Sequence, residues 1–307
     1  MDNSLSAFIS VVGRPNVGKS SFVNSALSHK VSIVSDKPQT TRTKIMGILT
    51  KDNTQLVFID TPGFHKPRNL LGQSMIKAVG DGLSDVDGAV LMVEAVTKFK
   101  FDAENLPAAE LELIEDLKKR KIPTILGINK IDLLQEKEEL LSIISAYADK
   151  MDFAAVVPIS AKNGDGVGII VEEALKLAKP SVHYFPDDEF TDQPDRIMVA
   201  EIIREKLLRS LDREVPHGIA VDVERFYERD TSSGEPILCV EAAIYCEKES
   251  HKGIIIGKGG SMLKKVGTRA RTDIEKFFDI KADVKLWVKV KEDWRNKGGI
   301  IHSFGLD

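Results

Sequence analysis

The sequence predicts an α/β domain, with a mostly parallel sheet and helices on both faces, followed by a smaller α+β domain. Through about residue 178, short apolar runs alternate with helical periodicity, which is the βαβ pattern of a parallel sheet. From residue 180 to 195 the chain is rich in proline and acidic residues and lacks periodicity, which is typical of a linker. The order of expected elements then changes to α-β-β-α-α-β. We therefore expect a first domain over 1–180, a linker over 181–196 and a second domain with a C-terminal tail over 197–307.

The individual elements follow from the spacing of apolar residues, which recur three and four apart in helices and form short runs in strands. The first domain should contain the strands Phe8–Val12, Leu56–Ile59, Gly88–Val93, Thr124–Ile128 and Ala155–Ile159. Its helices should be Ser20–Leu27, Glu110–Lys119, Lys137–Lys150 and Ile169–Ala178. The second domain should contain a helix, two strands, helical sequence around a glycine cluster and a last strand. The helix is Met198–Leu211 and the strands are Ile219–Arg225, Ile237–Cys246 and Ala282–Val290.

Composition limits the classes of function. A chain of 307 residues can bury two cores, and its net charge of −4 does not indicate nucleic-acid binding by the whole surface, so any basic site must be local. The N-terminal residues lack the basic and apolar regions of a secretory signal, and no apolar run is long enough to cross a bilayer. We expect a cytoplasmic protein. Cys239 and Cys246 cannot build a disulfide framework or a metal site, and we expect both to be reduced residues in strands.

The strongest chemical signal follows the first expected strand, in the sequence Gly-Arg-Pro-Asn-Val-Gly-Lys-Ser. Glycines let such a loop curl around phosphates, while backbone N–H groups and the start of the next helix attract negative charge. Lys19 should contact the β- and γ-phosphates, and the Ser20 hydroxyl should bind Mg²⁺. A glycine loop that merely turns the chain is the alternative, but the flanking strand and helix favour phosphate binding. The expected contacts are Gly13, Arg14, Pro15, Asn16, Val17, Gly18, Lys19, Ser20 and Ser21.

Two later motifs favour guanine over adenine. Asn129-Lys130-Ile131-Asp132 ends the strand Thr124–Ile128, and the Asp132 carboxylate can accept hydrogen bonds from guanine N1–H and its amino group. Asn129 can engage the N7/O6 side and hold the loop, while Lys130 should lay its aliphatic stem along the base. In Ser160-Ala161-Lys162, the Ala161 N–H should reach guanine O6. Either motif alone could be a surface turn, but their order after successive strands predicts binding of GTP and GDP.

The segments between these motifs should sense the γ-phosphate. Asp60-Thr61-Pro62-Gly63 ends the strand Leu56–Ile59, so Asp60 can hold Mg²⁺ through water while the Gly63 N–H reaches the γ-phosphate. Thr40-Thr41-Arg42 follows the first helix in a long irregular stretch, and we expect Thr41 to complete the Mg²⁺ shell only with GTP. An exposed polar loop residue is the alternative for Thr41. Loss of the γ-phosphate would release both segments, so they are the expected switch regions, and Lys19, Thr41 and Gly63 are the expected catalytic groups.

The second domain carries its own signal in Ile254-Ile-Ile-Gly257-Lys-Gly-Gly260. A G-x-x-G loop between two helices lets the backbone clamp a nucleotide chain. From Ser250 to Thr272 there are six basic residues and no acidic one, which fits a local phosphate-binding face. Apolar residues at helical spacing, Leu263, Val266, Ala270, Ile274 and Phe277, should be core, and a solvated basic helix without a ligand is the alternative. The expected RNA contacts are Ile256, Gly257, Lys258, Gly259, Gly260, Lys252, Lys264, Lys265, Arg269 and Arg271.

The five nucleotide motifs and the G-x-x-G loop together resemble the Era family of bacterial GTPases. The related Der proteins have two GTPase domains and MnmE has long flanking domains, whereas the Era family has one GTPase domain followed by a type II KH domain. The resemblance covers nearly the whole chain. It implies a P-loop GTPase that hydrolyses GTP to GDP and phosphate with Mg²⁺. It also implies that single-stranded ribosomal RNA is bound, with the 3′ end of 16S RNA as the expected target, and that assembly of the small ribosomal subunit is assisted.

The sequence lacks the residue that orients the attacking water in Ras-like enzymes. Ras-like enzymes place a glutamine after the DxxG glycine, but here that position is Phe64, which cannot orient water. His65 is the next candidate by proximity, although a lone histidine in a loop is more often solvated. Related GTPases with the P-loop asparagine, here Asn16, use it to help hold K⁺ beside the phosphates. The resemblance therefore implies slow hydrolysis that K⁺ stimulates.

A second function class remains open at this level. The G-x-x-G domain would then dock a protein or associate peripherally with the cytoplasmic face of the membrane, and the GTPase would be a signalling or cell-cycle switch. The basic stretch contains a glycine loop rather than a long amphipathic helix with an aromatic face. This difference favours RNA.

Overall fold

The computed structural model describes residues 4–64, 67, 69–95, 106–136, 138–212 and 215–306. The chain forms two compact units. The first is drawn from residues 1–32, 41–66 and 75–192, and the second from 33–40, 67–74 and 193–307. Two short segments from the first half of the sequence therefore pack with the second unit.

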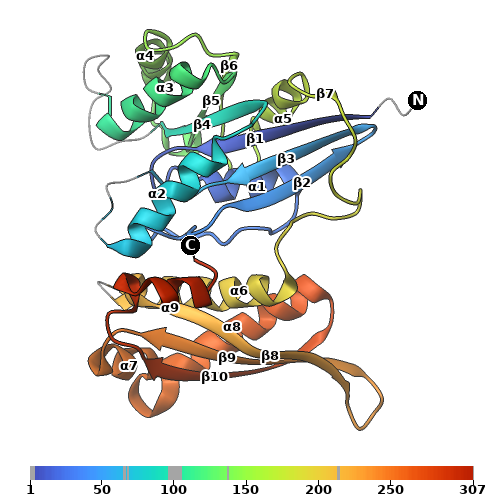
Figure 1. The fold of residues 1–307 in the computed structure, drawn as a ribbon, viewed down its shortest axis with the longest axis vertical. Coiled ribbons are helices and arrows are strands. Elements are labelled where there is room, and N and C mark those ends of the chain that lie inside the picture. Colours follow the sequence, from blue (N-terminus) through green and yellow to red (C-terminus); the bar gives the residue numbers. More distant parts are fainter. Residues whose placement is uncertain are drawn as a thin grey trace. The chain divides into compact units, whose positions relative to one another are not determined.

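The first unit is built on one sheet with the strand order β2-β3-β1-β4-β5-β6 (Figure 1). All neighbours on this path are parallel except β2 with β3, and the short β7 pairs antiparallel with β1. The strands are β1 (Leu5–Val12), β2 (Ile45–Lys51), β3 (Thr54–Asp60), β4 (Gly88–Glu94), β5 (Thr124–Asn129), β6 (Ala155–Pro158) and β7 (Lys179–Pro180). The predicted mostly parallel sheet is confirmed. The sequence reading missed β2, an edge strand joined to β3 by a tight hairpin at Asp52, which has φ of 54°.

Helices cover both faces of this sheet, as predicted (Figure 1). On one face, α1 (Lys19–Leu27) and α5 (Val167–Leu175) bury Phe22, Val23 and Ile170 against strand residues. On the other, α2 (Leu70–Gly82), α3 (Ala108–Arg120) and α4 (Glu138–Ala148) bury a second apolar layer that includes Leu113. The sequence reading did not predict α2. The two apolar layers make the sheet a rigid platform for the loops at its edge.

Residues 181–192 belong to the segment expected as a linker, and they lie along the first unit. The Ser6 hydroxyl donates to the Val182 carbonyl at 2.7 Å, and the Tyr184 N–H donates to Gln55 Oε1 at 2.8 Å. Phe190 stacks on His29 with ring centroids 3.7 Å apart. These contacts attach an irregular segment through backbone hydrogen bonds, which composition alone does not reveal.

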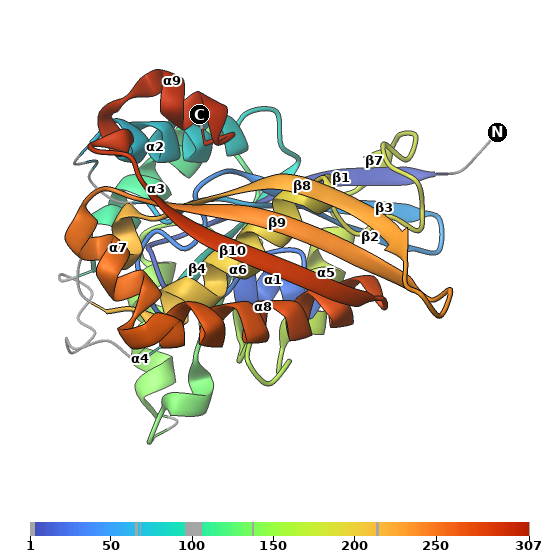
Figure 2. The same ribbon diagram turned by 90° about the horizontal axis from the view of Figure 1, so that it is seen from below.

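The second unit has the predicted order α-β-β-α-α-β, which is confirmed, with one further short helix near the C-terminus. Its sheet order is β10-β9-β8, with β10 and β9 parallel and β9 and β8 antiparallel. Figure 2 shows α8 running beside this sheet, and a single apolar core joins the sheet to α6, α7 and α8. The elements are α6 (Asp195–Ser210), β8 (Ala220–Asp230), β9 (Pro236–Cys246), α7 (Glu249–Ile256), α8 (Ser261–Phe278), β10 (Lys281–Val290) and α9 (Gly298–Ser303). Cys239 and Cys246 are buried free thiols on β9.

Candidate functional site

The nucleotide motifs of the first unit all follow the carboxyl ends of parallel strands. The phosphate-binding loop follows β1, Asp60 is the last residue of β3, Asn129 is the last residue of β5, and Ser160 follows β6. Carboxyl ends of neighbouring parallel strands meet at one edge of a sheet, which is where ligands bind in open α/β folds. The fold therefore brings these motifs together at that edge.

The Lys19 side chain is buried and forms hydrogen bonds with the phosphate-binding loop that precedes it. Its ammonium donates to the carbonyls of Gly13 at 3.1 Å and Arg14 at 3.0 Å, and burial lowers its pKa to about 8. Gly18 has φ of 101°, and a Cβ there would lie 2.1 Å from Asn129 Nδ2. The loop is thus held in a conformation that only glycine permits at this position, with its cation directed at its own carbonyls.

Three oxygen-bearing side chains converge beside Lys19. The Ser20 hydroxyl donates to Asp60 Oδ2 at 2.7 Å and lies 2.9 Å from Thr41 Oγ1. Asp60 is fully buried, burial raises the pKa of its carboxyl, and Oδ1 has no hydrogen-bond partner among the described residues. A buried carboxylate oxygen without a partner, next to two hydroxyls, fits a hard divalent cation such as Mg²⁺.

The structure separates the two adjacent threonines. Thr41 joins the Ser20 cluster, whereas the Thr40 hydroxyl donates to the Lys37 carbonyl at 2.7 Å in a local turn. Thr61, another predicted contact, is buried and donates its hydroxyl to the Val11 carbonyl at 2.8 Å. The Thr61 side chain therefore supports the sheet edge and is not directed to a ligand.

The segment after β3 lies close to the phosphate-binding loop. A Cβ on Gly63 would come within 2.6 Å of Pro15 Cα, and the Phe64 N–H donates to the Gly13 carbonyl at 3.1 Å. The Phe64 ring is half-buried against the apolar layer under α2, α3 and α4. His65 lies outside the described residues. A larger residue at position 63 would push the two loops apart.

The residues predicted to read guanine form a connected set. Asn129 donates from Nδ2 to the Val17 carbonyl at 2.7 Å, and its Oδ1 accepts the Ala161 N–H at 2.9 Å. The Ala161 N–H, expected at guanine O6, thus has a side-chain acceptor within the protein. The Ser160 hydroxyl donates to Asp132 Oδ1 at 2.7 Å, which orients an otherwise exposed carboxylate. Asn129 therefore links the phosphate-binding loop to the Ser160-Ala161-Lys162 motif.

Two acidic residues outside every motif complete this set. Glu94, the last residue of β4, pairs with Lys130, and Glu110, in the first turn of α3, pairs with Arg14. Of the two lysines predicted to contact the nucleotide through these motifs, Lys162 is exposed, and the Lys130 backbone lies in the left-handed region with φ of 68°. Sequence reasoning missed both acids because neither is adjacent in sequence to the cation it pairs with.

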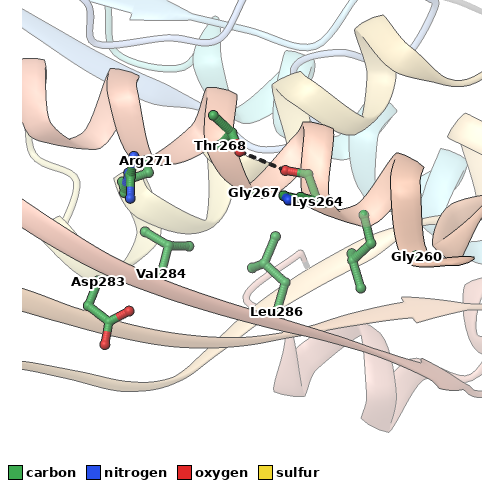
Figure 3. A pocket seen from close by; sticks show the side chains of 9 residues that line it. Gly260, Lys264, Gly267, Thr268, Arg271, Asp283, Val284 and Leu286 are labelled. Atoms are coloured by element: carbon green, nitrogen blue, oxygen red, sulfur yellow. Dashed lines mark hydrogen bonds between the residues drawn. The ribbon is translucent and has the colours of Figure 1, made fainter.

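The second unit holds a groove of about 390 Å³ beside the glycine loop (Figure 3). Basic side chains stand at one wall and apolar side chains of β10 at the other. Lys264 and Arg271 are predicted contacts that line it, as does Gly260. The complete lining is Gly260, Leu263, Lys264, Gly267, Thr268, Arg271, Asp283, Val284 and Leu286.

The structure modifies the prediction for this region in two respects. Leu263 packs against the core, as predicted, but it is half-buried and also lines the groove, whereas Val266, Ala270 and Ile274 are fully buried. The other predicted contacts, Ile256, Gly257, Lys258, Gly259, Lys252, Lys265 and Arg269, do not line the groove. Asp283, Val284 and Leu286 lie in the expected strand Ala282–Val290 but were not predicted as contacts, because nothing local in a strand shows that one face borders a groove.

The backbone of the glycine loop favours glycine, and at position 257 the neighbouring atoms require it. Gly257, Gly259 and Gly260 have φ of 73°, 57° and 78°, in the left-handed region. A Cβ on Gly257 would come within 2.8 Å of Met262 Cβ, whereas nothing lies within 4 Å of one on Gly259 or Gly260. The loop therefore presents backbone with open space on one side, as close approach of a nucleotide chain needs.

None of the described helices is long and apolar enough to cross a membrane.

Comparison with protein-family models matches both units. A model described as 50S ribosome-binding GTPase matches residues 8–130, and a KH-domain model matches residues 214–295. Among curated proteins, the chain is similar to GTPase Era of Ruminiclostridium cellulolyticum, with 46% identity over 98% of this chain and 97% of the relative. It is also 45% identical to GTPase Era of Clostridioides difficile, over 98% of both chains.

Two solved structures of Era proteins are similar to this chain over nearly its whole length. A crystal structure of Era in complex with MgGDPNP and nucleotides 1506–1542 of 16S ribosomal RNA has a TM-score of 0.91 and 34% identity, covering 99% of both chains. A variant of Aquifex aeolicus Era bound to GDP·AlF4⁻ has a TM-score of 0.90 and 33% identity, covering 98% of this chain and 99% of that chain.

Proposed function

The chain belongs to the Era family of P-loop GTPases, and from this premise we propose that it is a GTP-driven switch that binds the 3′ end of 16S ribosomal RNA and assists small-subunit assembly. The observation that carries the RNA part is the groove beside the glycine loop of the KH domain. One wall offers Lys264 and Arg271 to phosphates, and the other offers Val284 and Leu286 to bases. The relative crystallised with nucleotides 1506–1542 supports the same target. We propose domain limits of 1–180 and 197–307, joined by 181–196.

The experiment that tests this proposal crosslinks the protein to RNA in living cells and sequences the recovered fragments. The 3′ end of 16S RNA should be enriched above its share of total RNA. Fragments distributed in proportion to abundance, or no crosslinked RNA, would contradict the proposal. Recovery of the protein in a washed membrane fraction without RNA would instead favour the docking alternative, in which the KH domain associates with the inner face of the membrane.

At the nucleotide, we propose the following division of roles. Lys19 contacts the β- and γ-phosphates while the Gly13 and Arg14 carbonyls keep it oriented, because an ammonium group has three N–H donors and these carbonyls accept only two. Ser20, Thr41 and Asp60 would hold Mg²⁺, which when bound neutralises charge on the phosphates. The Gly63 N–H completes the set by donating to the γ-phosphate. Hydrolysis then depends on positioning and charge stabilisation more than on a side-chain base.

We predict that K⁺ supports faster GTP hydrolysis than Na⁺ and that Asn16 carries this difference. Asn16 is exposed and has φ of 66°, so the phosphate-binding loop presents it toward solvent in a conformation that favours asparagine. Turnover should be measured in matched KCl and NaCl for the parent and for Asn16→Ala. The parent should be several-fold faster in KCl and the variant equally slow in both, because K⁺ gives up its hydration water for asparagine and phosphate oxygens more readily than Na⁺ and then offsets developing charge. Equal parental rates in both salts would eliminate the K⁺ site.

We predict that Phe64→Ala keeps hydrolysis within about threefold of the parent, because the ring packs into the apolar layer and carries no group that can orient water. The Phe64 N–H bond to the Gly13 carbonyl is made by the backbone and survives the substitution. Single-turnover rates at saturating GTP measure the chemical step, and a melting temperature accounts for lost packing. Abolished hydrolysis with unchanged GTP affinity would show that the ring shapes the catalytic geometry.

A further inference from the structure

A hydrogen-bonded network, in which Glu110 and Tyr147 are buried and Arg14 is half-buried, joins the phosphate-binding loop to α3 and α4. Arg14 Nε donates to Glu110 Oε1 at 2.5 Å, and the Tyr147 hydroxyl donates to Glu110 Oε2. Glu110 is 0% exposed and Tyr147 is 1% exposed. The three residues come from three elements, because Arg14 belongs to the loop, Glu110 to α3 and Tyr147 to α4. Both carboxylate oxygens of Glu110 are thus used, and a single acid joins the loop to the helical layer.

Such a network is costly to bury and is not needed for packing. The core around α3 and α4 is apolar, with Leu113, Ile114 and Ile143 fully buried nearby in the same layer. Burial raises the pKa of Glu110, an effect that the hydrogen bonds from Tyr147 and Arg14 oppose and the negative charge of Glu94 enhances. Apolar residues of similar volume often give equal or greater stability than a buried ion pair. A role in geometry therefore explains the network better than a role in stability.

The geometry in question is that of the carbonyls that hold Lys19. The Arg14 carbonyl accepts from Lys19 Nζ at 3.0 Å, so the residue whose side chain Glu110 anchors also holds the catalytic cation through its backbone. Anchoring the Arg14 side chain restricts rotation of the adjoining peptide units. The Gly13 carbonyl, the second Lys19 acceptor, belongs to the peptide that joins Gly13 to Arg14.

We propose that Glu110, held by Tyr147, is a positioning residue for the phosphates: it anchors Arg14 and thereby fixes the loop carbonyls that aim Lys19. This rests on the assignment of the loop to GTP phosphates. A substitution that releases Arg14 should weaken the binding of both GTP and GDP, since the two nucleotides share the β-phosphate. Base recognition, which Asp132 carries, should be unaffected.

The test replaces the network by apolar side chains in the double variant Glu110→Leu/Tyr147→Phe. Affinities for GTP, GDP and XDP are measured by titration, with the melting temperature recorded in parallel. We expect GTP and GDP to bind about tenfold more weakly, with the GDP-to-XDP ratio and the melting temperature close to the parent. Asp116→Asn is the matched control, because Asp116 forms an exposed ion pair with Arg120 on the same helix. This control should bind both nucleotides as the parent does.

A second variant and a second site make the result decisive. If the double variant does not fold, Glu110→Gln preserves shape and should give a weaker loss of about threefold. Lys19→Ala reports on the site itself and should lose GDP and GTP binding. Loss in Lys19→Ala with parental affinity in folded Glu110 variants would overturn the positioning role alone. Parental affinity in Lys19→Ala would overturn the loop assignment and the positioning role together.

Discussion

Replacing Asp132 by asparagine is expected to move the base preference from guanine to xanthine. The carboxylate is expected to accept two hydrogen bonds from guanine, and an asparagine would place a donor against one of those donors. GTP affinity should therefore fall about 100-fold or more, since a charge-assisted pair is lost and one guanine donor is left unpaired. Xanthine has a carbonyl where guanine has its amino group, so XTP should bind more tightly to the variant than to the parent.

The structure indicates that this substitution preserves the hydrogen bond that orients the side chain. The Ser160 hydroxyl donates to Asp132 Oδ1 at 2.7 Å, and asparagine Oδ1 can accept the same bond, so the side chain keeps its orientation. Asp165→Asn is the matched control, because Asp165 is exposed in the neighbouring loop and its backbone carbonyl, rather than its side chain, accepts from Ser160. GTP, XTP and ATP affinities are measured for all three proteins. Undiminished GTP binding in Asp132→Asn would show that Asp132 does not read the base.

The sequence predicted those parts of the site that depend on consecutive residues. The loop from Gly13 to Ser20 has its chemistry in adjacent positions, and the strand before it and the helix after it have clear periodicities. The fold then brings Ser20, in the first turn of α1, and Thr41, in the irregular stretch before β2, to Asp60 at the end of β3. The prediction from sequence named Thr41 rather than Thr40, but the structure supplies the reason: the Thr41 hydroxyl lies beside Ser20, whereas the Thr40 hydroxyl donates to the Lys37 carbonyl.

Contacts between residues far apart in sequence could not be predicted. Glu110 lies 96 positions from Arg14, and an acid in the first turn of a helix is equally well explained by the helix dipole. The β10 wall of the groove was missed for a similar reason. Val284 and Leu286 alternate with polar residues in the manner of any half-buried strand, and nothing local shows that their face borders a groove.

Introducing acid into the glycine loop of the KH domain should abolish RNA binding while leaving the nucleotide site intact. In Lys258→Asp/Gly259→Asp, two carboxylates replace a cation and an open backbone position where phosphates are expected to approach. We expect RNA affinity to fall about 100-fold or more at moderate salt, because a phosphate contact is replaced by repulsion. GTP and GDP affinities should match the parent.

The loop can accept these substitutions without unfolding. Nothing lies within 4 Å of a Cβ built on Gly259, and its φ of 57° is a conformation that aspartate tolerates, as Asp52 and Asp279 do in this chain. A matched control, Lys276→Asp/Gly234→Asp, makes the same charge change in the same unit. Lys276 is exposed and does not line the groove, and Gly234 is an open glycine with φ of 79°.

Comparing the two double variants separates local contact from overall charge. Binding of a single-stranded oligonucleotide with the 3′-terminal 16S sequence is followed by anisotropy across a range of salt concentrations. The loop variant should lose affinity and show a shallower salt dependence, by about one unit of slope for each lost phosphate contact, whereas the control should keep the parental slope. Equal losses in both variants would mean that only net charge matters. RNA binding that survives in the loop variant would exclude the glycine loop from the interface and favour a docking role for the KH domain.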